Sequence, residues 1–307
     1  MDTVLVKKNN RLLSHFSRQW QLWLMVLPAL AIILVFNYIP MYGIQLAFRE
    51  FDFTKGLTGG EFVGFKYFQQ FFESPMFQTV IVNTLRISMT TLIFGFIAPI
   101  LLALIINQIR NPKRKKVMQT AVYLPHFIST VVMVGILQVF LSPETGVLVN
   151  LLNLDSSVNL MGSDSTFVPV YVISEVWQHC GWNSIIYLAA LSSIDTQLYE
   201  SADIDGANRF QKILHVDIPA LVPTMVILLI MNMGGVLNAG FEKIFLMQNS
   251  LNLSVSEVIS TYVYKIGILN SQFSYSTAIG LFNNIINFLF LVLANGLSKK
   301  YTNRSLW

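Results

Sequence analysis

The sequence predicts an all-α integral membrane protein with six transmembrane helices and both termini in the cytoplasm. Of the 307 residues, 54% are hydrophobic and 12% are charged, whereas a soluble domain carries about 25% charged residues. Apolar runs of the length that crosses a bilayer, about 20 residues, recur along the chain. Lysine and arginine gather in alternate connections between these runs, which defines one orientation.

Each apolar run is expected to be a helix, because lipid offers no partner for a free backbone group. The first run continues past the triplet Ala29-Leu30-Ala31, which resembles a cleavage site, so we interpret the run as an uncleaved anchor. Prolines inside the runs are tolerated in a membrane bundle as kinks. The six predicted spans are 22–48, 79–108, 117–141, 168–191, 221–241 and 276–297.

The basic residues set the orientation. Fourteen of the 20 lysines and arginines lie before the first span, between the second and third, between the fourth and fifth, or after the sixth. Positive residues favour the cytoplasm, so these regions are expected inside. The chain then divides into a cytoplasmic N-terminal segment (1–21), the first span (22–48), an extracellular segment (49–78), a five-helix core (79–297) and a cytoplasmic tail (298–307).

The last outer segment, 242–275, contains a helical pattern that is too short and too polar to cross. Its apolar residues recur at helical spacing. We expect a helix that lies at the outer surface or packs on the bundle. The residues of this pattern are Val255, Val258, Ile259, Tyr262 and Ile266.

A polar cytoplasmic loop, 196–219, interrupts the apolar sequence between the fourth and fifth spans. Glycine at position 206 permits a tight turn that a side chain would strain. Phe210, Ile213 and Leu214 then share one face of a short helix, and Pro219 is expected to end it. The sequence therefore predicts two short helices with a bend, exposing apolar residues and acids together. Resting on the inner headgroups is the alternative, but that leaflet is itself negative.

The loop resembles a signature of known transport proteins. It reads Glu200-Ser201-Ala202, three residues, Gly206, nine residues, Val216, Asp217, Ile218-Pro219. This is similar to the cytoplasmic motif Glu-Ala-Ala, three residues, Gly, nine residues, Ile, any residue, Leu-Pro of permeases in binding-protein-dependent ABC importers. Three positions depart, each to a residue of similar size. Segments 122–130, 181–191 and 275–288 resemble the carbohydrate branch of this family, including its oligosaccharide and polysaccharide-fragment subgroup.

The resemblance implies a type I ABC importer permease fold in a bacterial cell membrane. It implies partners: a second, similar permease, two ATPase subunits, an extracellular solute-binding protein and a sugar or oligosaccharide. ATP and Mg²⁺ would be bound by the ATPase, with no cofactor or metal on this chain. The residues that would dock the loop on the ATPase are Glu200, Ala202, Asp205, Gly206, Ala207, Phe210, Ile213, Ile218 and Pro219.

No catalytic constellation accompanies these features. The sequence lacks the G-x-x-x-x-G-K-[ST] loop of ATPases and the H-E-x-x-H metal motif. Its single cysteine, Cys180, excludes a disulfide or a multi-cysteine metal site within one chain. The bases form no patch with interleaved aromatics, so nucleic acid is not an expected partner. The sequence predicts a transport subunit and not an enzyme.

Two ionisable residues lie clearly within predicted spans, Arg86 in the second and Glu175 in the fourth. Such groups are functional candidates by default. Each lies about seven residues from the outer end of its span, so both are roughly 10 Å deep. Equal depth and opposite charge suggest an ion pair between the two spans. The alternative is that each side chain reaches independently toward the outer interface.

A sugar pathway needs aromatic faces for stacking and amides for hydrogen bonds. Such residues cluster in the outer half of the fourth span, with one more in the fifth. Helix packing or an interfacial aromatic belt remains the alternative for each of them. The candidates are Trp177, Gln178, His179, Trp182, Asn183 and Asn232.

The sequence thus favours a permease that moves a sugar or oligosaccharide inward, powered by ATPases on other chains. The same mechanism with an amino acid or peptide is the closest rival, because the loop signature would be shared. An ion-coupled transporter would need titratable residues along its path and usually an internal repeat. A membrane scaffold or receptor would not need the polar residues in the fourth to sixth spans.

Overall fold

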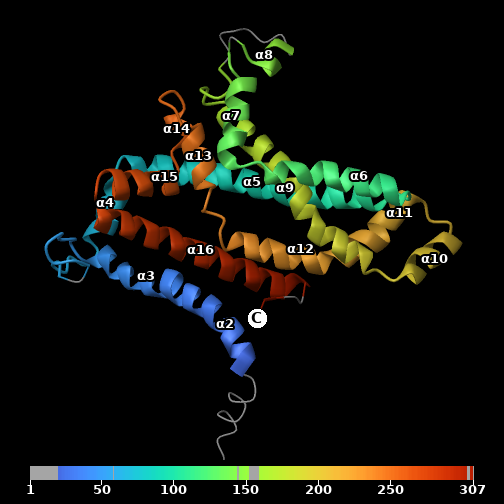
Figure 1. Cartoon of the computed structure of the whole chain (residues 1–307), viewed down its shortest axis with the longest axis horizontal. Coiled ribbons are helices and arrows are strands. Elements are labelled where there is room, and N and C mark those ends of the chain that lie inside the picture. Colours follow the sequence, from blue (N-terminus) through green and yellow to red (C-terminus); the bar gives the residue numbers. More distant parts are fainter. Residues whose placement is uncertain (1–19, 58, 144, 152–158, 303–304, 307) are drawn as a thin grey trace, which may run out of the picture.

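The structure, a computed structural model, describes residues 20–57, 59–143, 145–151, 159–302 and 305–306. Most of the predicted N-terminal segment 1–21 and part of the tail 298–307 lie outside these residues. Within them the chain is helical, and β pairing is confined to isolated bridges, Arg49 with Phe62 and Asp52 with Gly56. Four helices, α5, α9, α12 and α16, run along the long axis of the molecule (Figure 1). The all-α prediction is confirmed.

Within the described ranges, four helical segments are long and apolar enough to cross a membrane, or five if one bent pair counts as a span. Three of them match the predicted first, second and sixth spans in place, and the fourth overlaps the predicted fifth span. The fourth predicted span is a continuous helix, α9 (Phe167–Ser192), but its polar residues leave it outside this count. The four segments are Trp20–Phe48, Met76–Asn107, Arg209–Met233 and Phe273–Lys300.

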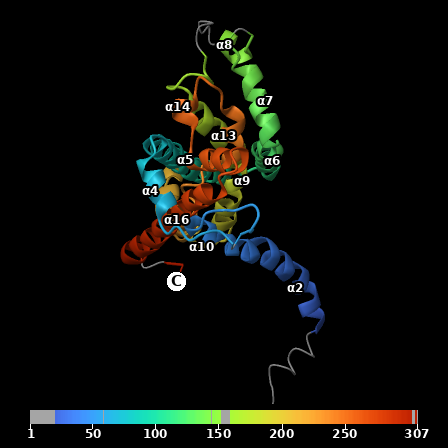
Figure 2. The ribbon, with the colours of Figure 1, turned by 90° about the vertical axis from the view of Figure 1, so that its left-hand side faces the viewer.

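The first span leaves the bundle at its start, whereas its last residues, Tyr42–Phe48, pack against α16. Its first helix, α2 (Trp20–Ile33), has no buried residue, and it reaches away from the bundle (Figure 2). The helical path continues beyond α2 to the outer end of the span. That path runs through a π-helical turn (Leu34–Tyr38), α3 (Ile39–Met41) and a 3-10 helix (Tyr42–Phe48).

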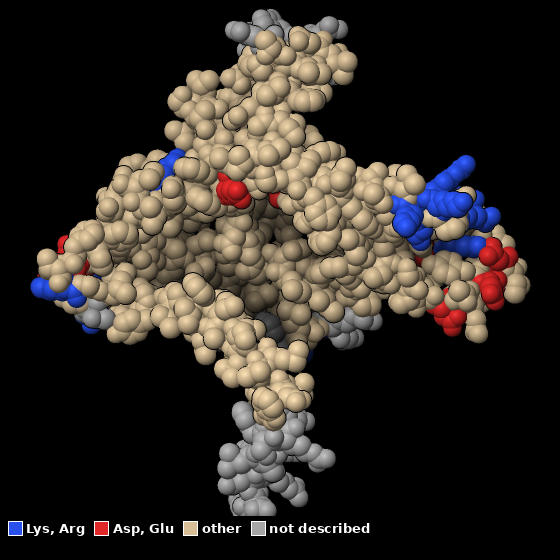
Figure 3. All heavy atoms as spheres, in the orientation of Figure 1, with Lys and Arg blue, Asp and Glu red and all other residues tan. Residues whose placement is uncertain are grey.

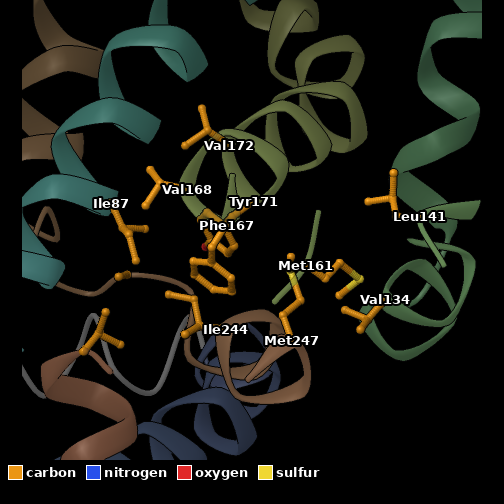
Figure 4. Packing of buried hydrophobic residues seen from close by; sticks show 12 residues of the cluster. Ile87, Val134, Leu141, Met161, Phe167, Val168, Tyr171, Val172, Ile244 and Met247 are labelled. Atoms are coloured by element: carbon orange, nitrogen blue, oxygen red, sulfur yellow. The ribbon is translucent and has the colours of Figure 1, made fainter. Parts of the chain in front are cut away.

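The centre of the bundle is α5 (Met76–Asn107) packed along α9. Ile87 of α5 and Phe167 and Tyr171 of α9 are buried in one apolar cluster that extends to α13 (Phe241–Met247) (Figure 4). A second cluster lies toward the other end of the bundle. It joins α5, α9 and α12 (Ile218–Met233) through Ala103, Leu104, Ile106, Tyr187, Leu188, Leu191 and Leu221.

The predicted third span, 117–141, is broken more sharply than the expected proline kink. The chain forms a helix over Pro112–Phe127 and a second over Thr130–Phe140, and these are bent by 95°. Ile128 and Ser129 between them are extended, and the Ser129 hydroxyl caps α7 by accepting a hydrogen bond from the backbone of Val132. The helices are α6 (Pro112–Tyr123), a 3-10 turn (Leu124–Phe127), α7 (Thr130–Phe140) and, beyond α7, α8 (Val147–Leu151).

The fifth predicted span, 221–241, is displaced along the chain. The helix runs without a break from Arg209 to Met233, so Pro219 does not end it as expected. A π-helical turn, Ile213–Asp217, lies just before the proline, and Ile218 donates its N–H to the Ile213 carbonyl. This wider turn accommodates a ring that has no N–H to donate, so the helix continues past it.

The outer segments pack on the bundle. The expected outer helix is two helices, α14 (Leu253–Ser256) and α15 (Ile259–Tyr264), rather than one. Asn83 of α5 donates to the Ser254 and Glu257 carbonyls, at 2.9 and 3.1 Å, where the two helices meet. The amide therefore satisfies the backbone that the break leaves free. The remaining elements are α4 (Lys66–Glu73), a π-helical turn (Lys265–Leu269) and α16 (Phe273–Thr302).

Candidate coupling loop and transport pathway

The cytoplasmic loop predicted from the sequence is two short helices with a bend, as expected. Helix α10 (Thr196–Ile204) begins where the Asp195 carboxylate accepts the Gln197 N–H, at 2.9 Å. Gly206 has a φ of +74°, a conformation that residues with a Cβ adopt only at a cost. Helix α11 (Arg209–Lys212) follows and leads into α12. Both short helices lie at one end of the bundle (Figure 1).

Internal contacts hold the two limbs of the loop in one shape. Asn208 and Gln211 form a reciprocal capping box at the start of α11, which satisfies two backbone donors. Lys212 forms an ion pair with Asp203 across the bend. A loop braced in this way can act as one body when a partner pushes on it.

The loop exposes apolar side chains beside acids. Ile204 is 87% exposed and Phe210 is 72% exposed, and Glu200 and Asp205 are exposed on the same loop. Figure 3 shows acidic and basic side chains gathered at this end of the molecule. Single exposed apolar residues are ordinary, but several on one rigid loop indicate an interaction surface.

The residues predicted to dock the loop do not all face outward. Ile213 and Ile218 are partly buried against the apolar cluster of α5, α9 and α12. They therefore anchor the base of the loop, whereas Phe210 and Leu214 remain exposed. The shared face expected for Phe210, Ile213 and Leu214 thus divides between the core and the surface.

Glu175 does not pair with Arg86. Among the described residues, its carboxylate contacts the Lys243 ammonium at 2.9 Å and the His179 ring at 3.3 Å. Lys243 is 3% exposed and also lies 5.6 Å from the centre of the Tyr171 ring. Arg86 is exposed on another face of α5. Equal distance from the predicted span ends therefore does not identify the partner, because the direction in which each side chain leaves its helix axis decides the contact.

Lys243 is the residue that the sequence reasoning missed. It lies two residues after the predicted fifth span, in the outer segment 242–275. The signal was available, since a base two residues after an apolar run can fold back onto the bundle.

A histidine pair links α9 to the bend after α6. The Nδ1 atoms of His126 and His179 are 3.1 Å apart, so one ring donates and the other accepts through a neutral nitrogen. The His126 ring stacks on Trp182, with centroids 4.5 Å apart and planes 8° apart. Together with Glu175 and Lys243, these side chains form a connected polar path across the bundle.

The six predicted pathway residues do not form one site. Gln178 is buried and donates to the Ile128 carbonyl at 2.8 Å, so it stabilises the bend. Trp177 lies in an apolar groove of about 970 Å³ between α5, α6 and α9, which Arg86 also lines. His179 and Trp182 belong to the histidine path, and Asn183 is exposed. Asn232 lines a separate cavity.

That cavity, about 290 Å³, is lined by α5, α9, the end of α12 and the segment that follows it. The hydroxyls of Ser88 and Thr91 lie in its wall, buried and without a hydrogen-bond partner among the described residues. Glu175 and Asn232 line it as well. Buried polar groups are nearly always hydrogen-bonded, so these hydroxyls are available for a polar ligand or for water. No three His, Cys, Asp or Glu side chains in the described ranges are placed to hold a metal ion.

Comparison with known proteins identifies the family. Residues 95–303 match the family described as "Binding-protein-dependent transport system inner membrane component", and the chain belongs to this family. It is 39% identical to the polygalacturonan/rhamnogalacturonan transport system permease protein YteP of Bacillus subtilis (strain 168), and the alignment covers 100% of this chain and 97% of YteP.

Two solved structures have the same fold. One is a bacterial ABC transporter involved in the import of the acidic polysaccharide alginate, with a TM-score of 0.87 and 40% identity over 95% of this chain and 99% of that one. The other is the alginate transporter in complex with its pentasaccharide-bound periplasmic protein, with a TM-score of 0.87 and 39% identity over 96% of this chain and 100% of that one.

The family and the fold confirm the main sequence-based prediction. The chain is a multi-pass inner-membrane permease subunit of an ABC importer, with the type I fold of such permeases. It is a transport component, as its relatives are, and not an enzyme.

Proposed function

We propose that this chain is one of two permease subunits that together carry an oligosaccharide into the cell. Two ATPase subunits, which bind ATP and Mg²⁺, would drive the movement from the cytoplasmic side. The observation that carries this proposal is the braced loop, which presents Ile204 and Phe210 beside exposed acids at one end of the bundle. A connector between spans needs neither the bracing nor the exposed apolar side chains.

The proposed topology has six crossings with both termini in the cytoplasm. Helix α9 is included among the six crossings because it packs along α5, although its polar residues make it less apolar than the other crossings. The bases at the start of α6 lie at the same end as the coupling loop (Figure 3), which agrees with a cytoplasmic position for both. The opposite end, formed by α4, α14 and α15, would then receive the extracellular solute-binding protein.

The proposed cargo is an oligosaccharide. The permease YteP is named for polygalacturonan and rhamnogalacturonan transport, and a solved relative is involved in the import of the acidic polysaccharide alginate. The free hydroxyls of Ser88 and Thr91, with Asn232, suit a ligand rich in hydroxyl groups. Trp182 and His179 would contribute beside Glu175, which lines the cavity and contacts His179 at 3.3 Å. An amino acid or peptide would instead need a site for its charged amino group.

The experiment is to purify the chain with its partner chains and its binding protein and to measure ATP hydrolysis in liposomes. Uronate oligosaccharides, neutral oligosaccharides and peptides are added in turn with the binding protein. We expect stimulation by an oligosaccharide and none by peptides. Stimulation by peptides alone, or purification without any ATPase, would contradict the proposal.

A further inference from the structure

A fully buried carboxylate lies at the root of the coupling loop. Asp217 is 0% exposed and is the last residue of the π-helical turn that precedes α12. Its Oδ1 accepts a hydrogen bond from the Tyr199 hydroxyl, and its Oδ2 accepts one from the Gln108 amide at 3.3 Å. Burying a carboxylate is costly unless it is hydrogen-bonded, so both donors are needed where they are.

The three residues belong to three different elements. Tyr199 lies on α10, Asp217 at the start of α12, and Gln108 at the C-terminal cap of α5. No lysine, arginine or histidine of the described residues pairs with Asp217 within 4 Å. The carboxylate is therefore held by two directional hydrogen bonds and not by a diffuse charge attraction.

Helix α10 depends on this contact more than its neighbours do. None of its residues is buried, so apolar packing does not fix it to the bundle. The turn at Gly206 and the Lys212–Asp203 pair join α10 to α11 only. Burial and the hydrogen bond to Asp217 both raise the pKa of Tyr199, which keeps its hydroxyl protonated as the donor.

We propose that Asp217 is a positioning residue that transmits movement of the coupling loop to α5. This inference rests on the proposed docking of the loop on an ATPase. A displacement of α10 reaches the carboxylate through Tyr199 and then the end of α5 through Gln108. Helix α5 carries Ser88 and Thr91 in the wall of the polar cavity, so the movement would alter the transport path.

The π-helical turn sets the direction of the Asp217 side chain. Such turns are frequent at functional sites, where an extra residue per turn changes the direction of a side chain. Here the turn places Asp217 inward while Ile213 and Ile218 pack on the core. That apolar packing holds α12 against α5 without the carboxylate, so removing the hydrogen bonds is expected to leave the fold intact.

The test uses the whole importer in liposomes, with sugar transported per ATP hydrolysed as the readout. The variants are Asp217→Asn, Tyr199→Phe and the two combined. Each single change removes or weakens a hydrogen bond to a charged group, so the transport-to-hydrolysis ratio is expected to fall about tenfold. The combined variant should be no worse than either single one, because both remove the same contact. Tyr187→Phe is the matched control: it removes a buried hydroxyl from α9 and should leave the ratio unchanged.

Three outcomes would overturn the inference. A wild-type ratio in assembled Tyr199→Phe would do so, even if Asp217→Asn failed to fold. Additive losses in the combined variant would show that the two residues act separately. An equal loss in Tyr187→Phe would point to general destabilisation. If the wild-type importer itself showed no ATPase stimulation by loaded binding protein, the proposed function would fail first and this inference with it.

Discussion

The buried ion pair between Glu175 and Lys243 gives the sharpest prediction about stability. Lys243 has a side chain that is 4% exposed, and its ammonium lies 2.9 Å from Glu175, whose side chain is 24% exposed. Changing Glu175 to Gln leaves a buried ammonium without its counter-ion. Removing one partner of a buried pair costs about 3–5 kcal/mol, and the partial exposure of Glu175 favours the lower value, about 3 kcal/mol.

The assay is thermal unfolding of the purified permease complex at one fixed scan rate. A loss of about 3 kcal/mol corresponds to a fall of roughly 6 °C in Tm, taking about 2 °C per kcal/mol for a chain of this length. Replacing both partners, by Glu175→Gln with Lys243→Met, removes the unpaired charge and should recover most of the loss. The control is Glu242→Gln, an exposed acid beside the pair. The reasoning fails if Glu175→Gln is as harmless as the control, or if the double variant melts no higher than Glu175→Gln.

Three further predictions concern the loop and the cavity. Gly206→Val places a Cβ at a φ of +74°, which costs about 1–2 kcal/mol. The amount of ATPase that co-purifies with the permease should therefore fall several-fold, and an unchanged amount would refute the need for this turn. Phe210→Ala removes an exposed apolar anchor and should weaken ATPase binding by about 2 kcal/mol, roughly thirtyfold, whereas Leu214→Ala, less exposed, should cost less; equal effects would argue against a specific contact. Ser88→Ala with Thr91→Val removes two unpartnered hydroxyls from the cavity wall. The transport rate of the oligosaccharide should fall while Tm rises or stays the same. A transport rate equal to wild type would exclude the two hydroxyls from the pathway.

The sequence predicts local features of this protein best. The bend at Gly206 follows from the backbone freedom of one residue, and it lies where the spacing placed it. The long apolar helices follow from composition alone, and their positions agree within a few residues for the second and sixth spans. These features depend on neighbours in the chain, so the sequence contains what is needed to find them.

Features that depend on packing were predicted less well. Pro219 by itself predicts the end of a helix, but the π-helical turn before it accommodates the proline ring, so the helix continues. The bend after α6 depends on Gln178, far along the chain, which binds the carbonyl of Ile128. Arg86 and Glu175 lie equally far from the ends of their predicted spans, but only the rotation of α5 and α9 against each other shows that Lys243 is the partner of Glu175. Asp217 occupies a variable position of the loop signature, so its burial was invisible before the fold was known.

The central claim is that the loop faces the cytoplasm and is gripped there by an ATPase. The direct measurement is labelling of Ser201→Cys, at an exposed position of α10, with the single native cysteine changed by Cys180→Ser, using a maleimide that does not cross membranes. We expect no labelling from outside intact cells, rapid labelling in inside-out vesicles stripped of ATPase, and protection when the ATPase is restored. Labelling from the outside, or an equal rate with and without the ATPase, would contradict the account.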